Sequence, residues 1–443
     1  MRTTRFLLAV TAALSAAPAL ADTVEATSTT YLNAGKQPRN ALPGQAPDLV
    51  DVMPVTEVVT VAARGIRNPV FDDLEVVVST WGSYDLRDRR WDNGTDGNLT
   101  GDVMTGYVRG RLLDRRLTLR VGRENVSLGA GRVASIDGGD LALRLPLGIG
   151  LTAYAGAPVA QRFSARDALR SWNALGGDLA YGGRASIAVP LPLAFLRLVE
   201  LGASAAFVDD GGEAVRRDAG VDARLRLFGD FALNAYALWA VEDERLAELN
   251  ALASWHPAHA WFVTADFRRS APDLMLSRTS ILSVFADSTR DEVGGGVRWE
   301  VLRSLEVGVD YHALLEPGED GTGTELGHDL AVRGDYSDGP IRAGAEVDWL
   351  KGADNGYVGA RFYVRRELGA LFAAAEVLAW AFDEAINSQD YAANASATLG
   401  YKLGKAWTAS LTGRAGATPY MEQQVDVMAK LAYNQTYRVR EVR

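Results

Sequence analysis

The segment Leu305-Glu306-Val307-Gly308-Val309-Asp310-Tyr311-His312-Ala313 places an apolar residue at every second position and a polar residue or glycine between them. Because successive side chains of a β-strand point to opposite faces, this period of two predicts a strand with one apolar and one polar face. The same pattern recurs in Leu117–Gly122, Trp261–Arg268, Ile341–Trp349 and Val425–Leu431. Such runs, each about ten residues long, predict roughly twenty strands from Asp73 onward.

Short and long connections alternate between these runs. Short turns fall near Asp114 and Gly229, whereas longer polar stretches occupy Leu86–Thr100, Ser127–Gly139 and Ala271–Asp291. Outer-membrane barrels join their strands in this way, with short turns at the periplasmic end and longer loops outside. A soluble antiparallel sheet would need a repeat of blade or domain length to pair its apolar faces, and the sequence has none. The predicted fold is therefore all-β, a transmembrane up-and-down antiparallel β-barrel of about 18–20 strands.

The composition excludes several classes of function. The chain has 443 residues, of which 48% are hydrophobic and 23% charged, and it contains no cysteine. Without cysteine there is no zinc–thiolate site, iron–sulfur cluster, disulfide or cysteine nucleophile. The formal net charge of −10 argues against a nucleic-acid partner, which requires clustered Lys and Arg. The stretch Asp92–Gly97 begins like a calcium loop, but Val103 stands where such a loop has its closing glutamate, so neither a metal nor a cofactor is expected.

The first residues predict an export signal. Arg2 and Arg5 precede the apolar stretch Phe6–Leu20, which is followed by a small-residue cleavage site at Ala21. About fifteen apolar residues are too few to span a bilayer as a helix. We therefore expect a signal peptide at 1–21, a periplasmic N-terminal extension or plug-like segment at 22–71, and an outer-membrane barrel at 72–443, with both termini in the periplasm.

If the apolar side of each strand faces lipid, the other side lines the interior and is strongly charged. Arginine is the prevailing cation, and its planar guanidinium forms bidentate pairs with carboxylates. Two interpretations stay open: these charges balance one another and stiffen the wall, or a subset of them lines a wet pore. The pore-lining candidates are Arg109, Arg111, Arg120, Arg144, Arg184, Arg224, Arg226, Asp266, Arg268, Arg298, Glu306, Asp310, Arg342, Glu346, Asp348, Arg361 and Arg365.

The aromatic residues fall into two sets. Those at strand ends on the apolar side are expected to form the interfacial girdle of a membrane barrel. The girdle candidates are Trp239, Trp255, Trp261, Trp299, Trp349, Tyr401, Trp407 and Tyr433. On the polar side, Tyr107, Tyr154, Tyr236 and Tyr363 are expected either to pack in the wall or to form a stacking track for sugar rings.

A barrel of about twenty strands is wider than its own side chains can fill. Ser127–Gly139 and Ala271–Asp291 are the candidates to fold inward as a constriction, and Val55–Ile66 is expected to dock below or inside the barrel. His312 and His328 are expected to be near neighbours across a hairpin. No nearby serine completes a hydrolase site with them, so no enzyme activity is predicted.

The export signal, the alternating strands and the alternating connections resemble the bacterial outer-membrane β-barrel, or porin-like, class over about Asp73–Tyr437. Leu117–Glu124 followed by Ser135–Gly139 is also loosely similar to a strand-and-loop pattern of polysaccharide-export barrels. The resemblance implies an integral outer-membrane protein that is surrounded by lipid and inserted by the barrel-assembly machinery.

The function favoured by these observations is a charged aqueous passage for polar solutes, with carbohydrate or polysaccharide as the preferred cargo. The alternative is a non-conducting structural barrel that anchors a multiprotein envelope machine, for secretion or motility, through periplasmic partners. A surface hydrolase is the third hypothesis.

Overall fold

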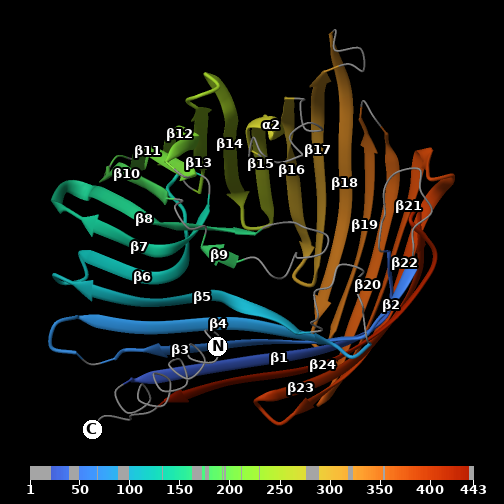
Figure 1. The fold of residues 1–443 in the computed structure, drawn as a ribbon. Coiled ribbons are helices and arrows are strands. Elements are labelled where there is room, and N and C mark those ends of the chain that lie inside the picture. The colour runs from blue at the N-terminus through green and yellow to red at the C-terminus, as the bar shows by residue number, and fades with distance from the viewer. Residues whose placement is uncertain are drawn as a thin grey trace.

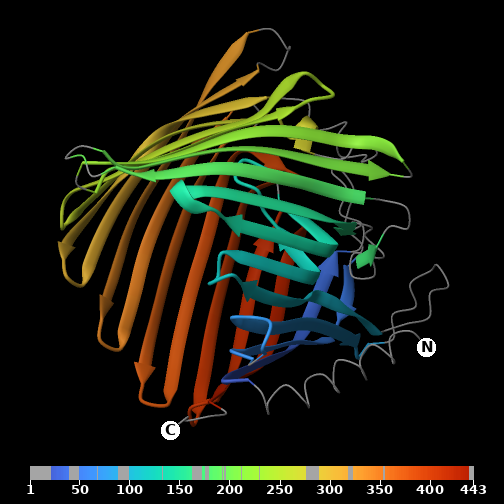
Figure 2. The ribbon, with the colours of Figure 1, turned by 90° about the vertical axis from the view of Figure 1, so that its left-hand side faces the viewer.

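The computed structural model describes residues 21–38, 49–66, 68–87, 99–131, 133–161, 172–174, 179–191, 193, 196–210, 212–228, 230–275, 289–317, 323–352 and 355–438. They form one closed antiparallel up-and-down barrel of 22 strands. Figures 1 and 2 show the strands following one another around a single wall. The all-β barrel predicted from the period of two is therefore confirmed.

The strands of the wall have the following bounds: β1 (Thr23–Pro38), β3 (Pro54–Arg64), β4 (Asp73–Asp85), β5 (Leu99–Leu112), β6 (Leu117–Val126), β7 (Ala134–Arg144), β8 (Ile149–Gln161), β10 (Leu179–Pro190), β11 (Leu196–Asp210), β12 (Glu213–Leu227), β13 (Ala232–Ala240), β14 (Arg245–Ala258), β15 (Trp261–Ser270), β16 (Arg290–Leu302), β17 (Leu305–Pro317), β18 (Thr324–Asp338), β19 (Ile341–Lys351), β20 (Tyr357–Leu368), β21 (Leu371–Ile386), β22 (Gln389–Leu403), β23 (Trp407–Thr418) and β24 (Met421–Arg438). Two short strands extend their neighbours, β2 (Leu49–Val52) beside β1 and β9 (Trp172–Ala174) beside β8. The described helical turns are η2 (Pro146–Gly148) and α2 (Pro272–Met275). In the described ranges, no helix has the length and apolarity that a membrane crossing requires.

The barrel closes between its first and last strands. β1 pairs with β3 on one side and with β24 on the other, from Thr23 opposite Arg438 to Ala34 opposite Val427. Both views show β1 and β24 side by side. Because every strand has a hydrogen-bonded neighbour on each side, the wall exposes no free sheet edge, as a barrel in lipid requires.

The segment 22–71 is part of the wall, so its assignment as a periplasmic extension or plug is wrong. β1 and β3 are two strands of the barrel wall, and they bring the number of strands from the expected 18–20 to 22. The period of two did not predict β1. Its sequence, TVEATSTTYLNAGKQP, has small polar residues on both faces, so apolar and polar positions do not alternate clearly. Val55–Ile66 likewise does not dock below or inside the barrel, because most of it belongs to β3 of the wall. Residues 1–20 of the predicted signal peptide (1–21) lie outside the described residues.

The two ends of the barrel differ in their connections. At one end, here called the turn end, the strands are joined by short turns such as 113–116, 303–304 and 339–340. The opposite end, here called the loop end, carries the predicted long loops, and their stretches 88–98, 162–171 and 276–288 lie outside the described residues. The turn end therefore carries short turns, as predicted, but the loop end carries both long loops and short turns such as 387–388 and 419–420, so the predicted strict alternation is wrong for those hairpins.

The exterior is an apolar band. On β17 and β19, Val309, Tyr311 and Val347 are exposed, whereas Gly308 and Leu314 on the other face are buried. On β15, outward-facing Trp261 and Arg269 are eight residues apart, which is about 27 Å along a strand and about 20 Å along the axis of a barrel whose strands tilt by about 40°. This height is close to the roughly 25 Å apolar band of outer-membrane barrels.

The aromatic girdle candidates all belong to this outer surface. Trp261 and Trp299 stack with ring centroids 5.2 Å apart, and Trp407 and Tyr433 lie 4.6 Å apart. These two pairs stand near the turn end, whereas Trp239 lies near the loop end of β13. The remaining candidates are Trp255 and Tyr401 near the turn end and Trp349 near the loop end. Outward-facing aromatic rings at both ends are the arrangement expected at two membrane–water interfaces.

Candidate functional site

The pore-lining candidates occupy the face of the wall opposite to the exposed apolar residues. On β19, Arg342, Glu346 and Asp348 alternate with outward-facing Ala343 and Val347. The same alternation turns the candidates on the other strands inward. The lumen is therefore lined by charged side chains from most of the wall.

About half of these charges are paired across strands. Arg120 lies 2.8 Å from Glu124 and 3.3 Å from Asp140, and the Glu124 side chain is only 1% exposed. Arg361 lies 2.7 Å from Glu376, and Arg109 and Arg111 pair with carboxylates of β4. Asp310 is held by Arg333 at 3.2 Å. For these side chains the interpretation that charges balance one another along the wall is supported.

Two sets of charges have no such partner. Within the described residues, no ion pair joins Arg224, Arg226 or Arg342 to a carboxylate, and all three stand toward the turn end. In the same described part of the chain, no cation pairs with Asp329 or Asp348, which lie toward the loop end of β18 and β19 at diagonal positions on the same face. By the same criterion Glu300 and Glu306, which face the lumen near the turn end, have no ion-pair partner among the described residues, so unpaired charges of both signs stand toward that end.

Glycines let side chains meet across an intervening strand. Arg184 of β10 reaches Asp222 of β12, with Nε 3.0 Å from Oδ2, because Gly202 lies between them on β11. A Cβ at Gly202 would stand 2.5 Å from the Asp222 carboxylate. His312 of β17 reaches Asp266 of β15 in the same way, at 3.2 Å across Gly294 of β16. These two bridges join β10 to β12 and β15 to β17 across the strand between them.

A short segment leaves the wall and packs inside the lumen. Residues 127–131 follow β6, and Leu128 and Ala130 are buried there, Leu128 to 2% exposure. Leu128 packs with Val126, Ile136 and inward-facing Tyr154 in an apolar cluster. Gly129 sits against the Arg184–Asp222 pair so closely that a Cβ would lie 2.2 Å from the carboxylate. The expectation that Ser127–Gly139 folds inward holds for this first part, whereas residues 134–139 belong to β7.

Several inward-facing aromatic rings are covered by other side chains. Arg120 lies over Tyr107 at 5.2 Å from the ring centroid, and Arg361 lies over Tyr363 at 5.4 Å. Tyr154 is buried in the apolar cluster under the segment 127–131. Arg298 and Arg365 cover two further rings, those of Phe262 and Phe372. For Tyr107, Tyr154 and Tyr363 the interpretation as wall packing is therefore favoured over a sugar track, whereas Tyr236 lines the pocket described next.

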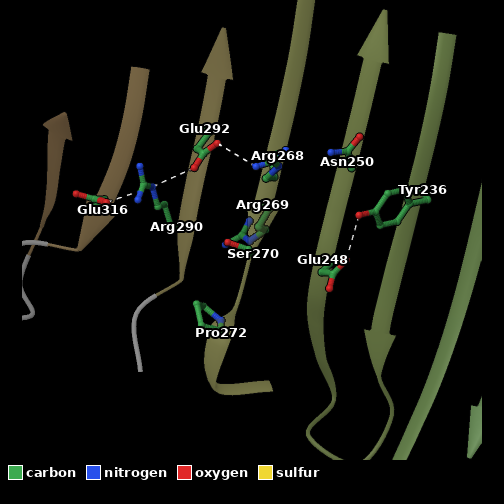
Figure 3. Close-up of a pocket in the computed structure, with 10 residues that line it drawn as sticks. All are labelled: Tyr236, Glu248, Asn250, Arg268, Arg269, Ser270, Pro272, Arg290, Glu292 and Glu316. Carbon is green, nitrogen blue, oxygen red and sulfur yellow. Dashed lines mark hydrogen bonds and ion pairs between the residues drawn. The ribbon is translucent and has the colours of Figure 1, made fainter. Parts of the chain in front are cut away.

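A pocket of about 580 Å³ lies on the inner face of β13–β17, near the loop end (Figure 3). Tyr236 donates a hydrogen bond to Glu248 at 3.1 Å, which places this carboxylate at one side of the pocket. On the other side, Arg290 lies 3.2 Å from both Glu292 and Glu316. Arg268 stands between the two sides, and the rest of the lining is Asn250, Arg269, Ser270 and Pro272. This pocket, which mixes both signs of charge, is the concave site that the sequence reasoning missed, because it depends on strand register.

The two histidines do not meet. His312 faces the lumen and bonds to Asp266, whereas His328 faces outward, where its Nδ1 lies 2.8 Å from the Tyr311 hydroxyl and its ring stacks near Trp349. Their adjacent register positions put the two side chains on opposite faces of the wall. The prediction that His312 and His328 are near neighbours is therefore wrong. Among the described residues, neither ring has a serine or threonine hydroxyl as a hydrogen-bond partner.

The closed wall, the apolar exterior and the charged interior together decide the class of the molecule. The fold is that of a porin-like outer-membrane β-barrel. No protein-family model matches the sequence, and no curated protein matches it.

Several solved barrels are similar to this porin-like chain in overall architecture. OccK9 (OpdG) of Pseudomonas aeruginosa is 12% identical, with a TM-score of 0.47 over 94% of this chain and 99% of that one. A BenF-like porin of Pseudomonas fluorescens Pf-5 is 8% identical, with a TM-score of 0.45 over 94% and 99% of the two chains. The P pilus usher PapC translocation pore is 10% identical, with a TM-score of 0.45 over 94% and 100%. No residue role passes from these proteins to the lumen described above.

Proposed function

We propose that this barrel is an outer-membrane channel that passes polar, charge-bearing solutes. The observation that carries the proposal is the combination of an apolar exterior with a lumen face lined by charged side chains, some of them uncompensated. Charges without partners are stable beside water and costly in a dry interior. A wall of 22 strands also encloses more cross-section than its own side chains fill.

The placement of the charges favours charged cargo over neutral cargo. A solute crossing the lumen from the loop end meets Asp329 and Asp348 first. Toward the turn end it meets charges of both signs: Arg224, Arg226, Arg342, Glu300 and Glu306. Arginine or lysine side chains lie over the rings of Tyr107, Tyr363 and Tyr31. A carbohydrate cargo therefore suits this lumen best when it carries charged groups of its own.

The proposal includes an orientation. The turn end faces the periplasm, because outer-membrane barrels place their short turns there. Both β1 and β24 have their outer ends, Thr23 and Arg438, at this side. The partners in this arrangement are the outer-membrane lipids, the barrel-assembly machinery and the polar solutes themselves.

Conductance in planar bilayers tests the proposed channel. The purified chain is expected to insert and give stepwise currents in potassium chloride. Replacing Arg224 and Arg226 together by glutamine should keep the steps and shift the reversal potential in a salt gradient toward cation preference, because two uncompensated positive charges leave the lumen.

Arg366→Gln is the matched control, since Arg366 faces outward on β20 and should leave the reversal potential unchanged. Absence of current from correctly folded barrels would contradict the channel and support a structural barrel that anchors an envelope assembly. Currents whose ion preference ignores the double substitution would contradict the role of the arginines.

A further inference from the structure

We infer that the lumen carries, close to its turn end, a binding site for doubly charged tetrahedral oxyanions: inorganic phosphate, sulfate or the phosphoryl group of a phosphorylated solute. The site is built around Arg342 of β19 and Arg365 of β20. This inference rests on the proposed channel, because a solute reaches these two side chains through the lumen. It adds a chemical class of ligand and a place of binding, which the charged wall alone does not specify.

The core of the site is a pair of like charges. Arg342 and Arg365 stand directly opposite each other on adjacent strands, and both point into the lumen. This register places their Cβ atoms about 4.5–5.5 Å apart. Like charges at directly opposite positions destabilise the pairing of two strands. The wall therefore holds two guanidinium groups side by side, and an anion between them would remove their repulsion.

Arg342 is open to such an anion. Its side chain is exposed, and in the part of the chain that the structure describes no carboxylate forms an ion pair with it. Asp335 of β18 lies at a diagonal position, but its Oδ1 accepts a hydrogen bond from the Tyr363 hydroxyl, whose ring crosses Gly344 between the two strands. The Arg342 guanidinium can therefore donate two parallel N–H bonds to a ligand.

Arg365 has a carboxylate partner, which it shares with a second cation. Its Nη2 lies 3.2 Å from Oε1 of Glu367, and Nζ of Lys402 lies 2.7 Å from Oε2 of the same carboxylate. Lys402 belongs to β22 and reaches Glu367 of β20 across β21, the strand between them in Figure 1. The guanidinium of Arg365 also lies over the ring of Phe372, 4.6 Å from its centroid. The Arg365 side chain nevertheless stays 42% exposed, so a ligand can reach it.

The chemistry of the ligand follows from this arrangement. Arg342, Arg365 and Lys402 surround the single carboxylate of Glu367, which leaves two positive charges uncompensated in this group. A doubly charged anion balances both of them, whereas a singly charged one balances half. A tetrahedral oxyanion also presents oxygens in several directions, so it can accept paired N–H bonds from two guanidinium groups at once. Glu367 competes with this ligand for Arg365.

Titration calorimetry on the detergent-purified full chain, at constant ionic strength, tests the inference with two probes of the same shape. Sulfate carries two negative charges, and methanesulfonate carries one. We expect sulfate to bind at least about tenfold more tightly, because only sulfate balances both arginines. Arg342→Gln should weaken sulfate binding by about tenfold or more and reduce its advantage over methanesulfonate.

Two further results separate a binding role of Arg342 from a structural one. The denaturant midpoint of Arg342→Gln should equal or exceed that of the parent chain, because the substitution removes a like-charge pair. Glu367→Gln should strengthen sulfate binding by about threefold or more, because the competing carboxylate is gone. A lower midpoint for Arg342→Gln would show that Arg342 holds the wall through a partner of its own and would overturn the assignment.

Arg366→Gln is the matched control, because Arg366 is the next residue along β20 and faces outward. It should bind sulfate like the parent chain. Equal affinity for sulfate and methanesulfonate would overturn the oxyanion site, and so would sulfate binding that survives Arg342→Gln. Bilayer currents from the same preparation separate the two proposals: currents without sulfate binding overturn the site alone, whereas sulfate binding without currents overturns the channel.

Discussion

Replacing Gly122 by alanine is expected to destabilise the barrel severely. Gly122 on β6 has a φ of 139°, and a Cβ there would lie 2.1 Å from the carbonyl oxygen of Gly106 and 2.7 Å from the Cα of Tyr107. Both of these atoms belong to the backbone of β5, so rotation of a side chain cannot relieve the clash. Backbone strain together with overpacking should lower the free energy of unfolding by about 3 kcal/mol or more.

Denaturant unfolding of vesicle-inserted barrels, followed by tryptophan fluorescence, measures this loss. Gly334→Ala is the matched control, because Gly334 lies in the wall on β18 and a Cβ there meets nothing within 4 Å. The control should unfold at the parent's midpoint. If Gly122→Ala also kept the parent's midpoint, the tight register between β5 and β6 would be wrong.

Val347→Arg is expected to cost about 2–4 kcal/mol, the penalty for a charge at the middle of the lipid-facing surface of a barrel. Val347 lies near the middle of β19, points outward and is 46% exposed. A guanidinium introduced at this position is surrounded by lipid, whereas near either rim of the barrel it could reach water. The same unfolding titration gives the change in free energy.

The same substitution at the neighbouring position, 348, is expected to leave stability nearly unchanged. Asp348→Arg places the same side chain one residue further along β19 on the lumen face, within reach of Asp329 and Glu346. This variant should change stability little, because water and two carboxylates surround the new cation. Equal losses for the two variants would mean that the two faces of β19 do not differ in their surroundings.

The sequence predicted the fold wherever the two faces of a strand differ clearly in polarity. Apolar and polar residues alternate regularly along β17 and β19, so the sequence alone assigns their inward-facing and outward-facing residues. The same pattern does not predict β1, because its residues Thr27, Ser28, Thr29 and Thr30 place polar side chains on both faces. Such a strand is held by its neighbours, here by β3 and β24, and its own pattern does not reveal it.

The candidate site was predictable only as a list of inward-facing residues. The position of Arg184 on β10 predicts that its side chain faces the lumen. Its partner Asp222, however, lies two strands away, and their contact depends on Gly202 between them. The pocket of Arg268 and Glu248 depends in the same way on the register of β14 against β15. Register is set by interactions between strands and by turn geometry, which a period of two within one strand does not encode.

The account depends above all on which face of each strand meets water, and single introduced cysteines measure this directly. The natural chain has no cysteine, so each introduced thiol is the only one present. In lipid vesicles, a charged membrane-impermeant maleimide is expected to label Asp310→Cys and Asp348→Cys rapidly and to leave Val309→Cys and Val347→Cys unlabelled. Rapid labelling at the two valine positions, with protection at the two aspartates, would contradict the placement of lipid outside and water inside the barrel.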